Sequence, residues 1–406
     1  MGKRVTLCTV AVGCGHSMAA KAIMSALRER DATLEVELIE ALDLAPRWFA
    51  VPYRDGYLRM IRHAPKLTGK LYDFSDVFEP TRGMGHRIES HVMRDLVRHP
   101  LIQSADMVIT THFLCGRVLS WARMDGTMKP PLAVCVTDQH PHGLWLTPHA
   151  DLTLVASDEA KCTAVQAGVR EGRVEVTGIP IHTRFANIDG GAARRELGVQ
   201  HERAVILVSG GGLGLGGLGE VVRELMAQPA GQAGEAHVVV VCGNNAALKE
   251  EMMPLERTPQ SGMMSCQVLG YTTQMAEWMS IASVLISKPG GLTTAEACAV
   301  GLPMVLVKPI PGQEERNAER LVSAGAAELE YDGVKAARGA RAIALSAERR
   351  AKMSAAAKGL GDVRAAQRVV EASLKMLEKS GYAADGSFSP GAMKAVSSMD
   401  GEPCRA

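Results

Sequence analysis

Residues 284–296 read VLISKPGGLTTAE, a stretch with the pattern of a strand, a tight turn and a helix. Val284, Leu285 and Ile286 are apolar residues of the kind that build buried parallel strands, and Pro-Gly-Gly ends the strand after Ser287. Thr293 and Thr294 are residue types that commonly start helices, so a helix is predicted to open there with Glu296 in its first turn. A strand that leads through a glycine turn into a helix is the repeating unit of an α/β fold with a parallel sheet.

The same alternation of strand and helix patterns extends over most of the chain. Strands are predicted in the first half at residues 5–12, 34–39, 107–111, 132–136, 152–155 and 174–176, and in the second half at residues 204–208, 237–241, 268–269, 284–287 and 304–307. The pattern lapses in the polar stretch at residues 185–191. We therefore expect two doubly wound, Rossmann-like domains, residues 1–187 and 188–380, that face a central cleft. Residues 381–406, rich in Gly, Ser, Asp and Pro, are predicted to be a disordered tail.

Composition narrows the functional classes. A chain of 406 residues is long enough for two or three domains, and its 47% apolar but only 4% aromatic residues suit cores of aliphatic side chains. The formal net charge of +1 argues against a nucleic-acid-binding protein, which needs a marked basic excess. The nine cysteines contain no C-x-x-C pair and the first residues do not form a signal-peptide pattern, which predicts a cytosolic protein. No uncharged apolar run reaches the ~18 residues that a membrane-spanning helix needs.

Two glycine turns are candidates for binding a phosphate or another polar ligand. The first contains Gly15 and His16 directly after a predicted strand. The second, SGGGLG at residues 209–214, follows the strand at residues 204–208. Glycines allow a ligand to approach the backbone closely, and the N–H groups of such a turn can hold a diphosphate without a metal, although glycine at these turns can also serve close packing alone. The second turn matches neither the P-loop nor the dinucleotide-binding fingerprint, which disfavours an ATPase and an NAD enzyme.

Polar residues at the helix starts of the second half suit a nucleotide sugar. Glu296 can accept hydrogen bonds from the paired hydroxyls of a ribose, and Gln313 and Glu314 follow the strand at residues 304–307, where a sugar ring would lie against a diphosphate. His16, at the mouth of the cleft, can accept a proton near neutral pH. Each residue alone is also compatible with a capping or surface role, and it is their combination that favours a site.

These residues carry a resemblance to a known family. The blocks GGLTTAE at residues 290–296 and GQEERNA at residues 312–318 resemble the donor-site signature of GT-B glycosyltransferases related to monogalactosyldiacylglycerol synthase and bacterial processive diacylglycerol glucosyltransferase. GCGHSMAA at residues 13–20 and TDQHPHGLW at residues 137–145 are similar to further segments of the same family. The matches run in order from about residue 5 to residue 325.

The resemblance implies a role for each matching residue. Glu296 would bind the ribose, and Gln313 with Glu314 would bind the hexose. His16 would be the general base, with Asp138 and His142 nearby. Members of this family displace UDP directly, with inversion at the sugar carbon, and the sequence contains no Asp-x-Asp triplet, so neither a metal nor a cofactor is expected. The diphosphate and the uracil would be held by the other predicted donor-site residues, which are Gly15, Ser209, Gly210, Gly211, Gly212, Tyr271, Thr272, Met275, Gly291, Leu292 and Thr293.

A cationic segment indicates the acceptor side. Residues 47–70 contain six Lys or Arg residues and one acid, interleaved with Trp, Phe, Tyr and aliphatic side chains. Such a segment suits a surface rich in anionic lipid, although a surface helix that merely covers the sheet would show a similar pattern. In the related enzymes the equivalent region helps to bind the membrane and to admit diacylglycerol.

The sequence therefore predicts an inverting hexosyltransferase that moves glucose or galactose from a UDP-sugar to a diacylglycerol-type lipid. The expected partners are the UDP-sugar, the lipid acceptor and an anionic surface at the inner face of the cell membrane. Alternatives stay open. One is transfer of N-acetylglucosamine to a polyprenyl-linked acceptor, because the same donor motif serves that group. Another is a UDP-sugar epimerase of the same fold, which would need no lipid-binding segment, and a third is a non-catalytic UDP-sugar sensor.

Overall fold

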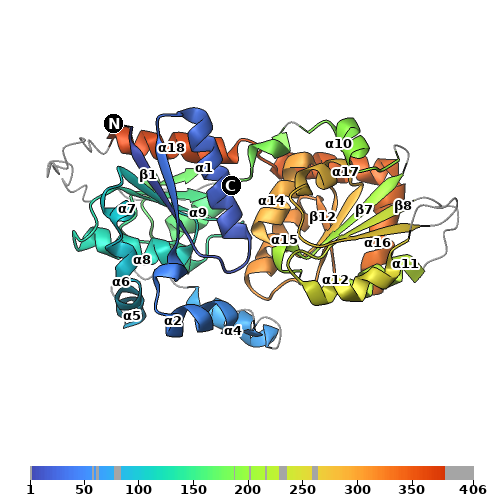
Figure 1. The fold of residues 1–406 in the computed structure, drawn as a ribbon, viewed down its shortest axis with the longest axis horizontal. Coiled ribbons are helices and arrows are strands. Elements are labelled where there is room, and N and C mark those ends of the chain that lie inside the picture. The colour runs from blue at the N-terminus through green and yellow to red at the C-terminus, as the bar shows by residue number, and fades with distance from the viewer. Residues whose placement is uncertain are drawn as a thin grey trace.

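The computed structural model describes residues 2–56, 59–60, 64–76, 84–186, 188–200, 203–214, 217–227, 236–257 and 264–379. Two α/β domains lie side by side, each built on a six-stranded sheet (Figure 1). This arrangement confirms the predicted GT-B architecture of two Rossmann-like domains. The predicted tail at residues 381–406 and the boundary residue 187 lie outside the described residues, so both stay predictions.

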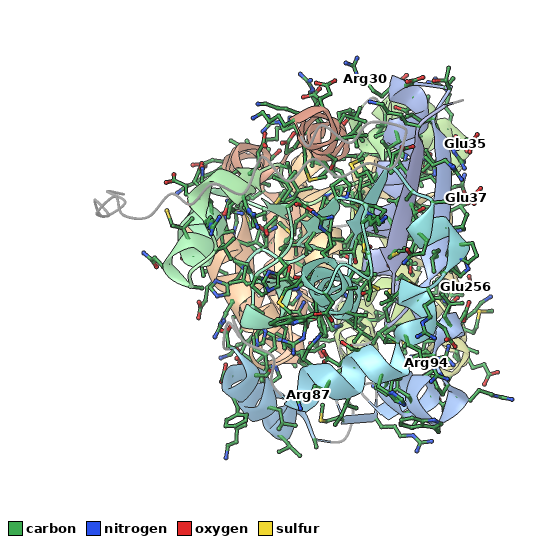
Figure 2. The ribbon with its side chains drawn as sticks, turned by 90° about the vertical axis from the view of Figure 1, so that its left-hand side faces the viewer. Arg30, Glu35, Glu37, Arg87, Arg94 and Glu256 are labelled. Carbon is green, nitrogen blue, oxygen red and sulfur yellow. The ribbon has the colours of Figure 1, made fainter. Side chains whose placement is uncertain are left out.

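The first sheet contains only parallel strands, in the order β2-β1-β3-β4-β5-β6. On the edge strand β2, Val36 and Ile39 point into the core while Glu35 and Glu37 are exposed (Figure 2). Charged residues on an edge strand disfavour pairing with another chain. The strands are β1 (Arg4–Thr9), β2 (Glu35–Glu40), β3 (Met107–Thr110), β4 (Leu132–Cys135), β5 (Leu152–Val155) and β6 (Val174–Val176).

The second sheet is also parallel, in the order β12-β11-β10-β7-β8-β9. Five of its strands were predicted. The edge strand β12 was not, because its sequence AELE is short and half polar. The strands are β7 (Ala204–Ser209), β8 (Ala236–Val241), β9 (Ser265–Leu269), β10 (Val284–Ser287), β11 (Met304–Val307) and β12 (Ala327–Glu330).

Helices flank both faces of each sheet, and aliphatic side chains fill one core cluster on each face (Figure 1). The helices of the first part are α1 (Gly15–Arg30), α2 (Arg47–Val51), α4 (Pro65–Ser75), α5 (Met84–Val92), α6 (Arg94–Val97), α7 (Pro100–Gln103), α8 (Phe113–Met124) and α9 (Asp158–Gln166). Those of the second part are α10 (Gly190–Glu196), α11 (Leu218–Ala227), α12 (Ala246–Met252), α13 (Met275–Ile281), α14 (Gly291–Val300), α15 (Gln313–Ser323), α16 (Gly333–Leu345), α17 (Ala347–Leu360) and α18 (Ala365–Lys379).

Helix α18 differs from its predicted place in the second domain. It crosses back and packs against α1 and β5 of the first domain (Figure 1). Its residues Val369, Val370 and Leu377 are buried in the same core cluster as Leu7 and Ile23. The first domain therefore obtains part of its core from the end of the described chain, a pairing that no local sequence pattern indicates.

Candidate active site

A cavity of about 670 Å³ lies between the two domains, at the carboxyl ends of both sheets. The predicted site residues come from six separate segments of the chain, and the structure brings every one of them to this cavity. They are Gly15, His16, Asp138, Ser209, Gly210, Gly211, Gly212, Tyr271, Thr272, Met275, Gly291, Leu292, Thr293, Glu296, Gln313 and Glu314. Their roles stay predictions, but their proximity is a property of the fold.

The cavity forms where the strand order reverses in each sheet. In the first sheet β1 and β3 are neighbours, and the segments after them carry His16 and His112. In the second sheet β7 and β10 are neighbours, and the segments after them carry Ser209 and Lys288. Connections leave such a pair of strands toward opposite faces, which opens a crevice for a ligand.

His16 lies in the first turn of α1, and its ring contacts two threonines of the first domain. Its Nδ1 is 2.8 Å from Oγ1 of Thr137, and a hydrogen bond with the backbone of Thr111 partly opposes the effect of burial on its pKa. The ring lies edge-on to that of His112, with the centroids 4.7 Å apart. Burial lowers the pKa of His16 to about 4. The imidazole is therefore neutral at neutral pH and able to accept a proton.

His112 was not predicted as a site residue, because the strand order that brings it beside His16 is not visible in the sequence. It caps the start of α8, where its Nδ1 accepts the N–H of Leu114 at 3.2 Å. Burial, together with the neighbouring His16, lowers the pKa of His112 well below its usual value. The cavity thus contains two adjacent neutral imidazoles. That of His112 caps a helix, and that of His16 does not.

Asp138 and His142, the other predicted groups near the base, are hydrogen-bonded within the protein. Oδ2 of Asp138 accepts the indole N–H of Trp145 at 3.0 Å, and Oδ1 accepts the side-chain amide of Gln313. Burial raises the pKa of Asp138, although these two hydrogen bonds oppose the shift. His142 accepts a backbone N–H at Nδ1 and donates its Nε2–H to the carbonyl oxygen of Tyr72 at 2.8 Å. Both oxygens of Asp138 and both ring nitrogens of His142 are thus engaged within the protein.

Glycines allow the two domains to approach closely around the cavity. A Cβ atom at Gly212 would lie 2.0 Å from Sγ of Cys14, and one at Gly291 would lie 2.2 Å from the carbonyl oxygen of Thr137. Gly211 adopts a φ of 67°, and its N–H donates to Oγ of Ser209 at 3.3 Å. Larger residues at these positions would push the domains apart, so the glycines set the width of the cavity.

Helix α14 begins at Gly291, two residues before the predicted start. The N–H groups of its first turn have no intrahelical partners, and the residues that carry them line the cavity. Glu296 consequently lies in the second helical turn, not in the first as predicted. Its carboxylate forms no hydrogen bond or ion pair with any residue that the structure describes, and burial raises its pKa to about 8. A half-buried carboxylate without a partner in a cavity wall is suited to receive the hydroxyls of a ligand.

The carboxylate of Glu314 is engaged inside the protein, which differs from its predicted use as a sugar ligand. Nζ of Lys288 lies 2.6 Å from its Oε1, and the N–H of Ile310 donates to its Oε2 at 2.8 Å. The side-chain amide of Gln313 likewise donates to Asp138 in the first domain. Sequence reasoning missed Lys288, which lines the cavity directly after β10 and brings a positive charge to its donor side.

Tyr271, Thr272 and Met275 form the cavity wall beyond β9. The ring of Tyr271 is 57% exposed, and Oγ1 of Thr272 accepts the N–H of Gln274 at 3.1 Å. Met275 starts α13. An accessible aromatic ring beside a cavity offers a stacking surface for a planar base, so the predicted uracil position is sterically open.

The part of the cavity inside the first domain is mainly apolar. Tyr53, Leu71, Phe113 and Trp145 line it next to His16. None of the four was predicted as a site residue, and Tyr53 and Leu71 come from segments outside the strand-turn-helix units that guided the prediction. A chamber of this composition favours a ligand with a hydrocarbon part.

Helices α2 and α4 expose apolar side chains beside cations. Trp48 is 68% exposed, and Leu67 and Phe74 on α4 are 52% and 84% exposed. Both helices lie at the lower edge of the first domain in Figure 1, and Lys70 is exposed among these residues. Of the predicted cationic segment, residues 57, 58 and 61–63 lie outside the described residues, Arg62 among them. None of the helices in the described part of the chain is both long and apolar enough to span a bilayer.

Within the ranges that the structure describes, no three His, Cys, Asp or Glu side chains are grouped so as to hold a metal ion. The expectation of a reaction without metal or cofactor stays a prediction.

Two family models match the chain, one for each domain. Residues 16–181 match monogalactosyldiacylglycerol (MGDG) synthase, and residues 205–369 match the glycosyltransferase family 28 C-terminal domain. The chain is 34% identical over 228 residues to processive diacylglycerol beta-glucosyltransferase of Bacillus pumilus, a region that covers 56% of this chain and 57% of that protein. The enzyme of the same name from Bacillus subtilis is 34% identical over 224 residues, 55% of this chain and 56% of that protein. The chain thus spans little more than half the length of the curated relatives it matches.

Solved structures share the whole arrangement at low sequence identity. MurG of Acinetobacter baumannii has a TM-score of 0.59 at 17% identity and covers 92% of this chain and 99% of its own. A putative UDP-N-acetylglucosamine 2-epimerase from Listeria monocytogenes has a TM-score of 0.60 at 17% identity and covers 94% of this chain and 98% of its own. At this identity the structural likeness shows the fold alone. The family models and the sequence relatives are more specific, because they indicate which group of glycosyltransferases the chain resembles. The first domain is thus similar to monogalactosyldiacylglycerol synthase and the second to the glycosyltransferase family 28 C-terminal domain, and somewhat more than half of the chain is similar to processive diacylglycerol β-glucosyltransferases.

Proposed function

We propose that this protein transfers a hexose from a UDP-sugar to a diacylglycerol-type lipid at a membrane surface, with inversion at the anomeric carbon. One observation carries the proposal. A single cavity joins the unpartnered carboxylate of Glu296 to the neutral imidazole of His16, which stands beside an apolar chamber. The first group suits a nucleotide ribose, and the second suits an acceptor hydroxyl on a molecule with hydrocarbon chains.

The donor side supports a nucleotide diphosphate sugar. The start of α14 at Gly291 and the loop at Ser209 lie on the same side of the cavity as Lys288, so helix N–H groups and one ammonium group surround a place for a diphosphate. Two structures of similar fold are described with such ligands, Staphylococcus aureus MnaA with UDP and Anabaena Alr3699/HepE with UDP-glucose, at TM-scores of 0.59 and 0.53. We assign the ribose to Glu296 on the same side.

The proposed reaction is a direct displacement. The acceptor oxygen forms a bond to the anomeric carbon while the bond from that carbon to the β-phosphate oxygen of UDP breaks. The acceptor proton passes to the imidazole of His16, and the charge on the departing UDP is stabilised by the first turn of α14 and by Lys288. Asp138, whose two oxygens accept hydrogen bonds from Trp145 and Gln313, is assigned to positioning.

Purified protein incubated with UDP-glucose, UDP-galactose or UDP-N-acetylglucosamine, and with vesicles that contain diacylglycerol, tests this function. Mass spectrometry should find a hexosyl lipid from one of the first two donors, and NMR should show the anomeric configuration opposite to that of the donor. Transfer only from UDP-N-acetylglucosamine to a polyprenyl acceptor would contradict the hexose and the diacylglycerol. Release of an epimerised sugar without a lipid product would identify an epimerase, a reaction in which the apolar chamber has no use.

The pH dependence of turnover should reflect the lowered pKa of His16. A base is active in its neutral form, and a pKa lowered to about 4 keeps His16 neutral at every pH above about 5. At saturating UDP-sugar, kcat should therefore stay nearly constant from pH 5.5 to 7.5 in a pH titration of the wild-type protein. An ordinary histidine would lose about half of its activity near pH 6.5. A fall centred there would assign the base to a different or a more exposed group.

Membrane attachment should depend on α4 as well as on the cations. Replacing Leu67 and Phe74 with Ser removes two exposed apolar side chains that do not line the cavity. It should weaken binding to phosphatidylglycerol vesicles about 30-fold or more, because each buried apolar side chain is worth roughly 1 to 2 kcal/mol at an interface. Replacing Arg54 and Arg59 with Gln should weaken binding mainly at low salt. Vesicle flotation measures both effects.

The control is Tyr331→Ser in the second domain, where an equally exposed aromatic residue, 60% exposed, is removed far from α4. It should leave vesicle binding unchanged. Full binding by the α4 variant would mean that this helix is only a surface element and that the lipid reaches the chamber by another route.

A further inference from the structure

One face of α15 joins the two domains. Gln313, Arg316, Asn317 and Arg320 follow each other at helical spacing, and all four contact the first domain. Asn317 accepts the N–H of Gln139 at 3.2 Å, and Arg320 donates to the side chain of the same Gln139 at 2.5 Å. Gln313 reaches Asp138. Arg316 contacts the end of α4, and the proposed function does not use it.

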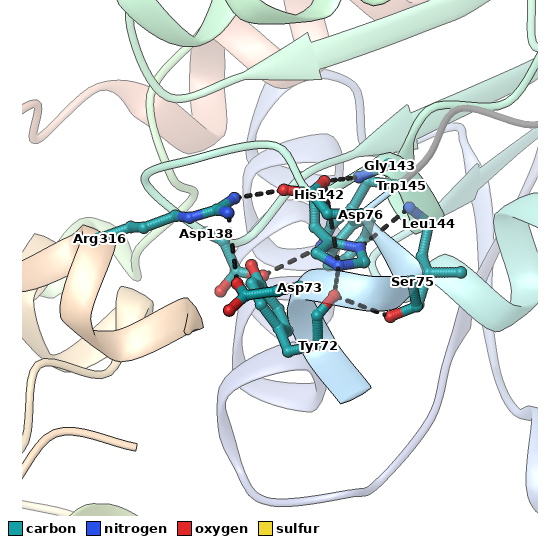
Figure 3. A network of polar contacts seen from close by, with 10 residues as sticks. All are labelled: Tyr72, Asp73, Ser75, Asp76, Asp138, His142, Gly143, Leu144, Trp145 and Arg316. Atoms are coloured by element: carbon teal, nitrogen blue, oxygen red, sulfur yellow. Dashed lines mark hydrogen bonds and ion pairs between the residues drawn. The ribbon is translucent and has the colours of Figure 1, made fainter. Parts of the chain in front are cut away.

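Arg316 holds the end of α4 through three groups (Figure 3). Its guanidinium donates to Oδ2 of Asp76 and lies 3.6 Å from Oδ1 of Asp73, while its central carbon stands 5.5 Å from the centre of the Tyr72 ring. Gly312, just before α15, has a φ of 90°, and a Cβ atom there would lie 2.5 Å from the same ring. The start of α15 therefore fits closely against Tyr72, and Arg316 adds a charged hydrogen bond to this contact.

The segment that Arg316 holds is a wall of the apolar chamber. Thr68, Leu71, Tyr72 and Ser75 of α4 line the cavity. From the rest of the first domain, the Nε2–H of His142 donates to the carbonyl oxygen of Tyr72 at 2.8 Å, and the N–H of Gly143 donates to Oδ1 of Asp76 at 2.7 Å (Figure 3). From the donor domain, Pro311 lies against Gly69 of α4, so that a Cβ atom there would be 2.6 Å away. Arg316 supplies the charged part of this contact between α4 and the donor domain.

We propose that Arg316 is a positioning residue for the acceptor: it seats α4 against the donor domain as the wall of the acceptor chamber. This inference rests on the proposed function for the identity of the acceptor, but not for the seating of α4. Losing Arg316 should loosen that wall while the donor-side groups around Glu296 keep their places, because Arg316 does not line the cavity. The effect should therefore appear in acceptor binding and not in donor binding.

Arg316→Gln tests the inference in the full-length protein, with Arg320→Gln as a matched control. Arg320 lies one turn further along the same face and also bridges the domains, to Gln139 and to Glu159 at 3.6 Å, but it does not contact α4. Arg316→Gln should raise the acceptor KM about tenfold, as expected for losing a partly exposed charge-assisted contact, with UDP affinity by calorimetry within about twofold of wild type. Arg320→Gln should change the acceptor KM by less than about twofold.

A double-mutant cycle identifies the partner. Asp76→Asn should raise the acceptor KM to a similar extent, and the double variant with Arg316→Gln should be hardly worse than either single variant, because both remove the same contact. Additive effects would show that Arg316 and Asp76 act separately. A parallel loss of UDP affinity in Arg316→Gln, or an equal effect of Arg320→Gln, would show that α15 merely holds the domains together, and it would overturn the inference.

Amide hydrogen exchange separates this inference from the proposed function. Residues 65–75 should exchange faster in Arg316→Gln than in wild type and in Arg320→Gln, with no acceptor present. A wild-type protein that fails to glycosylate diacylglycerol would refute the proposed function. Unchanged exchange of α4 in Arg316→Gln would refute the seating role itself, whatever the reaction.

Discussion

Replacing His16 with Ala is expected to lower kcat by about 10² to 10⁴ while UDP affinity stays within about threefold of the wild type. The loss follows from the placement of the imidazole, which lines the cavity beside the apolar chamber while its Nδ1 is held by Thr137. Without a base, the acceptor hydroxyl must lose its proton to water inside an apolar chamber. Steady-state kinetics with saturating donor and lipid measures the loss, and calorimetry measures the retained UDP binding.

His112→Asn is the matched control for His16. The ring of His112 is adjacent to that of His16, and asparagine retains an oxygen that can cap the first turn of α8 in place of Nδ1. This variant should lower kcat by less than about tenfold. If the two variants lose activity equally, the pair of rings acts as one packed unit and the base lies elsewhere. If His16→Ala loses UDP affinity in step with kcat, the residue belongs to the donor loop.

Replacing Glu296 with Ala is expected to weaken UDP binding about ten- to hundredfold at pH 8.5. A charge-assisted hydrogen bond between a carboxylate and ribose hydroxyls is worth roughly 1.5 to 3 kcal/mol. The high pH matters because burial raises the pKa of Glu296 to about 8, so the free protein carries this residue largely protonated at pH 7. Calorimetric titration with UDP gives the affinity directly.

The same assignment fixes the sign of a pH effect on donor binding. A group with a raised pKa is neutral below that pKa, and a ligand that needs its ionised form binds better as the pH rises through it. UDP affinity should thus increase between pH 6.5 and pH 9 in the wild type and stay flat in Glu296→Gln. Glu319→Gln, at an exposed position on α15, should behave like the wild type. Equal UDP affinity of Glu296→Ala and the wild type at pH 8.5 would show that Glu296 does not bind the ribose.

The sequence predicts the donor half of the cavity well because its residues follow strand ends directly. A glycine turn after β7 or β10 has to lie at the carboxyl edge of the sheet, wherever the other elements are placed, so Ser209 and Glu296 could be assigned to the cleft from local pattern alone. The start of α14 was placed two residues late, because Gly291 begins the helix without a typical capping side chain. Such an error shifts Glu296 by a turn but leaves it in the cavity.

What the sequence does not predict depends on contacts between distant segments. Gln313 and Glu314 sit where expected, but their polar groups meet Asp138 and Lys288, partners fixed by domain docking and by a buried ion pair. His112 joins His16 only through the strand order of the first sheet. Arg316 meets α4 only when the two domains are in place. Local periodicity contains no information about these pairings. The contacts between distant segments and between the two domains can therefore be seen only in the structure.

The return of α18 to the first domain sets an order for folding during protein synthesis. Domains generally fold as they leave the ribosome, the N-terminal one first. Here the hydrophobic groove beside α1 stays open until residues 365–379 have been made, since Val369 and Val370 complete that core. The second domain, whose own clusters of core residues precede α18 in the chain, can consolidate before the first is finished. A nascent chain of this protein would thus expose an incomplete first domain through most of its translation, a stage at which chaperones would have their main opportunity to bind.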